Sequence, residues 1–255
     1  HDRTLTSYTS SIWDYRPNAN TSPPAFDTMH RALRTRKLDP KTLLFKIPKI
    51  VHFTVADKVK DHQMKVVEYS KKKAESFGFE VMIHRDSDAE ALIYSQYHNL
   101  VPAWELLKTT TDQTKGARIG DFVRLLLIYH YGGVYLDSDM VTCKDLTPLL
   151  GPPGVATFPL VNSVAGGIVN AVFAGPPRHI VFRMALEMQS NNKKLHTQAI
   201  IRATGPKQLG DALDAYFEKT HTPRIVKFVE KEQLPEPEND SMWIQSGLIR
   251  FGATE

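Results

Sequence analysis

The stretch GARIGDFVRLLLIYHYGGVYLDSDMV, residues 116–141, decides the fold of this sequence. Apolar residues recur at helical spacing in its first part, which predicts a largely buried helix over residues 114–131. The glycine pair at 132–133 favours a turn that needs positive φ or a very close approach of two backbones. The segment VYLDSDMV then predicts a strand over residues 134–141, because its side chains alternate in character with a period of two.

Two aspartates separated by one serine stand at the end of this predicted strand. With a period of two, Tyr135, Asp137 and Asp139 share one face. The opposite face carries the apolar residues Val134, Leu136 and Met140. Ligands of open α/β sheets bind at the carboxyl ends of strands, and a hard cation such as Mg²⁺ or Mn²⁺ offsets the repulsion between two close carboxylates. The alternative is a pair of aspartates that only cap a strand end in solvent.

The predicted helix carries charged residues on one side. Arg118, Asp121 and Arg124 lie at spacings of three along it. An aspartate between two arginines on a buried helix is either a structural ion pair or part of a site for a polar ligand.

The rest of the chain predicts one α/β domain over residues 46–255, preceded by a polar, turn-rich arm or stem over residues 1–45. A strand over residues 46–56, a helix over 57–78 and a second strand over 79–86 form a βαβ unit, which implies a parallel sheet. Further predicted helices cover residues 101–110, 178–191 and 204–220. In the last of these, Thr204 is expected to cap the helix and Pro206 stands in its first turn. Further predicted strands cover residues 155–161, 167–175 and 223–231.

Composition narrows the class of protein. The 255 residues are 42% hydrophobic with a net charge of +4, and the basic residues form no single stripe, so we predict no nucleic-acid partner. Cys143 is the one cysteine, so the chain cannot form an internal disulfide. No apolar run approaches the roughly 18 residues of a membrane span, and the sequence begins with His1, which is compatible with an anchor or leader outside this chain.

The segment RIGDFVRLLLIYHYGGVYLDSDM resembles the DXD sugar-binding region of the family 32 glycosyltransferases, and IPKIVHF resembles the first strand of that family. The family includes yeast-type mannosyltransferases that act on glycans and sphingolipids, and the clostridial glucosylating toxin domains share its core pattern. The resemblance implies an α/β, GT-A type, Rossmann-like nucleotide-sugar-binding fold with a mostly parallel central sheet. It also implies a UDP- or GDP-sugar donor, a divalent metal (Mn²⁺ or Mg²⁺) and retention of anomeric configuration.

The same resemblance implies roles for the central residues. Asp121 and Arg124 would contact the donor sugar and phosphate, and Tyr135 would lie near the sugar or the diphosphate. Asp137 would bind ribose or sugar hydroxyls and share the metal, which Asp139 would hold directly.

Other donor-binding residues follow from the resemblance. His52 and Phe53, placed after the first strand, would meet the nucleotide base and ribose, and Gly133 would lie beside the donor. Either Asn162 or Asn170 would supply a further donor contact.

Near the carboxyl terminus, ENDSMW places Glu238, Ser241 and Trp243 at a spacing seen in the toxin-type enzymes. There such a segment closes over the donor, so Ser241 and Trp243 would bind the donor and Glu238 would complete the metal shell. The alternative interpretation of Trp243 is an ordinary packing residue that does not bind the donor. Many relatives have R-A-D where this chain has IGD, so Arg118 is out of register and is expected to pair with Asp121.

The sequence therefore predicts a metal-dependent, retaining glycosyltransferase that moves a hexose to a glycan, lipid or protein acceptor. The alternative is a catalytically inactive homologue that binds sugar nucleotides or glycans. A nucleotidyltransferase would need a glycine- and basic-rich phosphate loop after the first strand, and HFTVADKVKDH offers none. We expect a Golgi lumenal enzyme whose membrane anchor lies outside this chain, or otherwise a cytoplasmic or secreted one.

Overall fold

The computed structural model describes residues 46–151, 156–159, 170–220, 226–229 and 249–251. The predicted arm over residues 1–45 lies outside them. The first half of the chain forms β1 (Ile50–Val55), α2 (Asp61–Ser76), β2 (Glu80–Arg85), α3 (Asp86–Gln96), the 3₁₀ turn η1 (His98–Leu100), α4 (Val101–Lys108) and α5 (Lys115–Tyr131). The second half forms β3 (Gly133–Leu136), β4 (Met140–Thr142), the 3₁₀ turn η2 (Thr147–Leu149), β5 (Ala156–Pro159), β6 (Val172–Gly175), α6 (Ile180–Ser190), α7 (Ile200–Ala203), α8 (Pro206–Thr220), β7 (Val226–Val229) and β8 (Ile249–Phe251).

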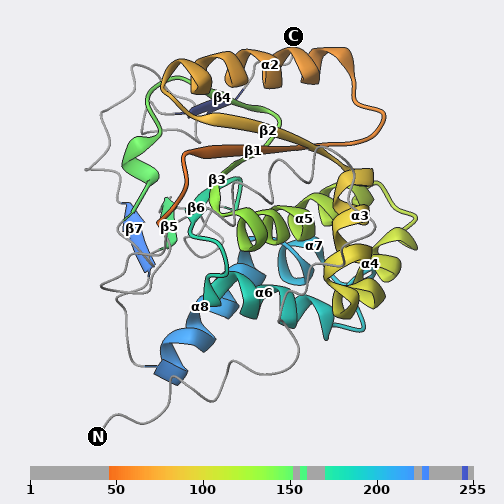
Figure 1. The fold of residues 1–255 in the computed structure, drawn as a ribbon. Coiled ribbons are helices and arrows are strands. Elements are labelled where there is room, and N and C mark those ends of the chain that lie inside the picture. Colours follow the sequence, from red (N-terminus) through yellow and green to blue (C-terminus); the bar gives the residue numbers. More distant parts are fainter. Residues whose placement is uncertain (1–45, 152–155, 160–169, 221–225, 230–248, 252–255) are drawn as a thin grey trace, which may run out of the picture.

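A six-stranded sheet in the order β2-β1-β3-β6-β5-β7 forms the centre of the fold, and β4 pairs with β8 in a separate ribbon (Figure 1). The predicted βαβ unit is confirmed, because β1 runs parallel to β2 in register from Ile50–Glu80 to Val55–Arg85. β1 is also parallel to β3, and β5 to β7, whereas β6 is antiparallel to both β3 and β5. The prediction of a mostly parallel α/β sheet is therefore confirmed.

Two hydrophobic cores lie on opposite faces of this sheet. α2 covers one face, and the helices α3 to α8 cover the other (Figure 1). Along β3, Val134 and Leu136 pack into the core beneath α2, while Tyr135 packs into the core that contains α5. The predicted division of this strand into two faces is confirmed at these positions, since successive side chains of a strand point to opposite sides.

α5 is the most completely buried helix of the described chain, and its carboxyl end leads directly into β3. Gly132 and Gly133 join the two elements with φ values of +65° and +111°, which L side chains rarely adopt. A Cβ atom at Gly132 would lie 2.5 Å from Cδ of Pro177, and one at Gly133 would lie 2.6 Å from the carbonyl oxygen of Ile50. The predicted glycine turn is therefore confirmed, and both positions need glycine because of the backbone conformation and the close neighbours.

Several predicted boundaries are wrong. The strand predicted over residues 134–141 ends at Leu136, and a turn follows in which the Met140 amide donates to the Asp137 carbonyl at 3.0 Å. α2 begins at Asp61 rather than near Asp57, and the sequence interpretation missed α3. Pro206 does begin α8, but the hydroxyl of Thr204, which was expected to cap that helix, donates to a carboxylate of α5 instead.

Candidate active site

Asp137, Ser138 and Asp139 form the tight turn between β3 and β4, which we call the DXD turn. The backbone amide of Asp137 donates to the carbonyl of Ala171 at 2.9 Å, so the turn is tied to the start of β6. Asp137 is partly buried, whereas Asp139 is exposed. The two carboxylates therefore differ in environment, although they come from adjacent positions of one short turn.

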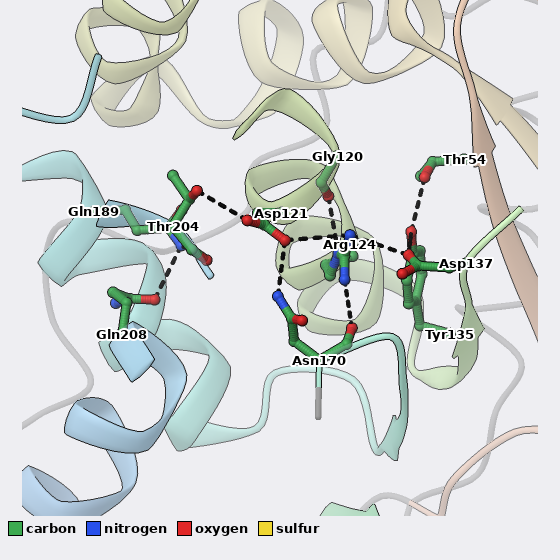
Figure 2. A network of polar contacts seen from close by, with 10 residues as sticks. All are labelled: Thr54, Gly120, Asp121, Arg124, Tyr135, Asp137, Asn170, Gln189, Thr204 and Gln208. Carbon is green, nitrogen blue, oxygen red and sulfur yellow. Dashed lines mark hydrogen bonds and ion pairs between the residues drawn. The ribbon is translucent and has the colours of Figure 1, made fainter. Parts of the chain in front are cut away.

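Arg124 joins the DXD turn to α5 (Figure 2). Its Nη2 atom lies 3.0 Å from Oδ1 of Asp137 and 3.2 Å from Oδ1 of Asp121. Its guanidinium also stacks over the Tyr135 ring, with 5.0 Å between the guanidinium carbon and the ring centroid. The side chain is 9% exposed, so this one cation neutralises two carboxylates largely away from solvent.

The carboxylate of Asp121 has a protein partner on each oxygen. Oδ1 accepts a hydrogen bond of 2.8 Å from the Asn170 amide, and Oδ2 accepts one of 3.0 Å from the Thr204 hydroxyl. Burial raises the pKa of Asp121, and Arg124 together with these hydrogen bonds opposes that rise. These contacts therefore fix the orientation of the Asp121 carboxylate at the base of the site.

Tyr135 connects the DXD turn to the end of β1. Its hydroxyl donates to Oδ1 of Asp137 at 2.8 Å and lies 2.8 Å from the hydroxyl of Thr54. Burial raises the pKa of Asp137 to about 6, and the charge of Arg124 and the Tyr135 hydrogen bond oppose the shift. A carboxylate with this pKa gains from a bound cation, which would favour its ionised form.

The polar network continues from the site towards α6 and α8 (Figure 2). The Gln189 amide donates to the Thr204 carbonyl at 3.2 Å and to Oε1 of Gln208 at 3.0 Å. Gln208 in turn donates to the Ala185 carbonyl at 2.9 Å. The side chains that hold Asp121 are therefore themselves fixed by buried contacts.

The DXD turn supplies ligands that suit a hard divalent cation. Within the described part of the chain, both side-chain contacts of Asp137 go to Oδ1, which leaves Oδ2 for a ligand. Asp139 adds an exposed carboxylate, and Mg²⁺ and Mn²⁺ prefer such oxygen ligands. Among the described residues, however, no group of three histidine, cysteine or acidic side chains could hold a metal. Two carboxylates fit a cation that is bound together with substrate phosphate.

Three predicted donor-binding residues lie elsewhere. His52 and Phe53 lie inside β1 rather than after it, and both are fully buried, so the prediction that they meet the base and ribose is wrong. The ring nitrogens of His52 lie 2.9 Å from His84 Nε2 and 2.8 Å from the Gly132 carbonyl, which gives His52 a role in joining strands. Gly133 is buried against β1, which accounts for glycine there without a donor.

Arg118 does not form the predicted ion pair with Asp121. Its Nη1 donates to the Leu195 carbonyl at 2.9 Å and its Nε to the Thr114 hydroxyl at 2.8 Å, so it anchors α5 to the segment after α6. The four remaining predicted residues lie outside the described part of the chain: Asn162, Glu238, Ser241 and Trp243. Their roles stay predictions.

Sequence reasoning missed Thr54, and it gave Thr204 the wrong task. Thr204 begins the sequence TGP at residues 204–206, and this short motif was the available signal. Asn170, one of two alternatives from the sequence, is the asparagine that the structure places against Asp121. Its contact with a donor stays a prediction.

This sheet, with carboxylates at the carboxyl end of β3, defines a GT-A glycosyltransferase fold. The chain superposes on a solved structure named PaToxG glycosyltransferase with a TM-score of 0.54 and 15% identity, over 77% of this chain and 78% of the other. Residues 54–154 match the model of the family described as the glycosyltransferase sugar-binding region containing DXD motif. This matched segment, less than half of the chain, is similar to that family of DXD-containing glycosyltransferases.

Two curated relatives are also similar to parts of this chain. Inositol phosphoceramide mannosyltransferase 1 of Schizosaccharomyces pombe is 33% identical over 106 residues, which cover 40% of this chain and 32% of the relative. Mannosyl phosphorylinositol ceramide synthase SUR1 of Saccharomyces cerevisiae is 27% identical over 194 residues, or 71% of this chain and 46% of the relative. The chain thus spans less than half the length of either relative. No helix within the described residues has the length and apolarity to cross a membrane.

Proposed function

We propose that this protein transfers a hexose from a nucleotide-diphosphate sugar to a hydroxyl group, with a divalent cation and with retention of anomeric configuration. The observation that carries the proposal is the double contact of Arg124 with Asp121 and Asp137. It brings a helix carboxylate and the DXD turn together at the carboxyl end of β3, where open α/β sheets bind ligands.

The residues of the turn match the needs of a diphosphate leaving group. Asp139 and the Oδ2 atom of Asp137 would hold Mn²⁺ or Mg²⁺, which when bound would neutralise charge that develops on the leaving diphosphate. The sequence also predicts that Glu238 completes the metal shell. Arg124 keeps Asp137 ionised and oriented, and Tyr135 fixes the Oδ1 atom of the same carboxylate. Such preorganised charge is usually the largest contribution to catalysis.

Retention is best explained by front-face transfer. A retaining enzyme that formed a covalent intermediate would need a carboxylate nucleophile. Asp121 is a poor one, because its Oδ1 meets Arg124 and Asn170 while its Oδ2 accepts from Thr204. We therefore propose that the leaving phosphate deprotonates the acceptor hydroxyl on the same face of the sugar. Detection of a covalent glycosyl–Asp121 adduct by mass spectrometry would contradict this mechanism.

The proposed acceptor is a glycan, a lipid or a protein. The names of two relatives refer to inositol phosphoceramide and mannose, so a mannosyl donor and a sphingolipid headgroup are the first pair to assay. We also propose a Golgi lumenal location.

A donor panel tests the function. GDP-mannose, UDP-glucose, UDP-galactose and UDP-N-acetylglucosamine would each be incubated with the protein, with and without Mn²⁺, and released nucleoside diphosphate would be measured. We expect metal-dependent release from at least one donor. Metal-dependent donor binding without release would favour the inactive, sugar-nucleotide-binding homologue, and neither binding nor release would refute both.

A further inference from the structure

Polar side chains of α2 contact the segment that contains the DXD turn. Gln63 Nε2 donates to the Ser138 hydroxyl at 2.5 Å, and Ser138 is the middle residue of the turn. Seven residues further along α2, the Ser70 hydroxyl donates to the Met140 carbonyl at 2.7 Å and accepts from the Thr142 amide at 3.0 Å. Residues seven apart lie on the same side of a helix, so α2 contacts the chain within and directly after the turn.

α2 is a rigid support for these contacts. Val67, Ser70 and Ala74 are fully buried, and they seat the helix on the core that contains Val134 and Met140. Figure 1 shows α2 lying along β4 on the face of the sheet opposite α5. The DXD turn is therefore held from two sides, by Arg124 from α5 and by Gln63 from α2.

These two contacts act on different residues of the turn. Arg124 and Tyr135 hold Asp137, whereas Asp139 has no hydrogen bond or ion pair to another described residue. The direction of the Asp139 carboxylate thus depends on the backbone on either side of it. Ser138 precedes Asp139 and is fixed by Gln63, so the Gln63 contact is the nearest side-chain constraint on the amino-terminal side.

We infer that Gln63 is a positioning residue that orients Asp139 through Ser138, so that the turn can bind a divalent cation together with a nucleoside diphosphate. This inference rests on the proposed function, because it assigns the cation to the DXD turn. Residues that orient metal ligands without touching the metal typically contribute 10–100-fold to metal affinity. Since Gln63 acts through the backbone of a neighbouring residue, we expect it to contribute about tenfold to the affinity for the metal, the lower end of that range.

The test is a double-mutant cycle with Gln63→Ala, Ser138→Ala and the double variant. Binding of Mn²⁺ would be measured by electron paramagnetic resonance, with Mn²⁺ alone and with UDP or GDP added, well below the melting temperature of each variant. Ser76→Ala is the matched control, because Ser76 is a neutral α2 residue whose hydroxyl donates to the Lys73 carbonyl away from the turn. Hydrogen exchange of the amides of residues 138–140 would report on the turn without any ligand.

We expect each single variant to weaken Mn²⁺ binding about tenfold and the double variant to be no weaker than either, because the two side chains act as one unit. Ser76→Ala should bind Mn²⁺ like the wild type. Gln63→Ala should also speed amide exchange at residues 138–140. Unchanged Mn²⁺ affinity and exchange in Gln63→Ala, with a wild type that binds Mn²⁺, would overturn the inference and leave the proposed function intact. A wild type that binds no Mn²⁺ with either nucleotide would instead overturn the metal-dependent function and the inference with it, whatever the exchange rates.

Discussion

Replacement of Arg124 by methionine should destabilise the protein strongly. The substitution keeps an unbranched apolar stem and removes the guanidinium group whose charge neutralises Asp121 and Asp137. The loss of one partner of a buried pair typically costs about 3–5 kcal/mol, because it leaves an uncompensated charge.

The structure places the expected cost within that range. Asp121 is 8% exposed and keeps its hydrogen bonds from Asn170 and Thr204, while Asp137 is 26% exposed and is partly compensated by solvent. We therefore expect about 3 kcal/mol, the lower end of the range for a buried pair. Arg124→Lys should lose less, about 1.5–3 kcal/mol, because the charge stays but one ammonium group cannot reach every acceptor of the guanidinium.

Urea denaturation at pH 7.5 would measure these free energies of unfolding. Lys207→Met is the matched control, since Lys207 pairs with Asp211 at 2.7 Å on the surface, and such pairs contribute about 0–1 kcal/mol. The penalty of Arg124→Met should shrink as the pH falls, because the carboxylates that Arg124 neutralises then take up protons. Equal free energies of unfolding for the Arg124→Met and Lys207→Met variants would refute the account of Arg124 as the centre of the site.

Three further predictions concern the frame around the site. Gly133→Ala should lower the free energy of unfolding in urea by about 2–4 kcal/mol, because φ is +111° and the new Cβ would meet a carbonyl oxygen. The control Gly116→Ala should be neutral or stabilising, because its new Cβ would have nothing within 4 Å. Burial, assisted by a neighbouring histidine, lowers the pKa of His84, so the unfolded chain takes up the proton first as the pH falls. Below about pH 6.5, the free energy of unfolding of the wild type should therefore decrease relative to that of His84→Gln, by as much as about 1.4 kcal/mol per pH unit. Parallel pH profiles for the two proteins would contradict this. Ser70→Ala should cost about 1–3 kcal/mol, because it leaves a buried amide and carbonyl without their partner, and Ser76→Ala on the exposed side should cost less than about 0.5 kcal/mol.

The sequence predicts the local parts of this fold well because their signals are local. The apolar spacing of α5, the glycines at 132 and 133, and the alternation of β3 all lie within one continuous stretch, and the structure confirms each of them. The βαβ unit at the start of the domain follows from the same kind of pattern. The predicted end residues of helices and strands were less accurate, as at the end of β3, because tertiary contacts decide the last residue of an element.

The missing parts of the site depend on contacts across long sequence separations. Gln63 meets Ser138 from 75 residues away, and Thr204 meets Asp121 from 83 residues away. No periodicity or turn chemistry encodes such pairings, since they arise only when α2 and the segment between α7 and α8 are placed against the rest of the fold. The position of His52 was misjudged for a related reason, because a polar residue near a strand end can equally serve as a buried link between strands.

The central claim is that the DXD turn binds the cation that supports glycosyl transfer. The most direct measurement is the Mn²⁺-dependent release of nucleoside diphosphate by wild type, Asp139→Asn and the control Asp214→Asn, an exposed aspartate of α8. We predict that Asp139→Asn abolishes release while it keeps the wild-type melting temperature, and that Asp214→Asn has no effect. Wild-type rates of metal-dependent release in Asp139→Asn would contradict the account.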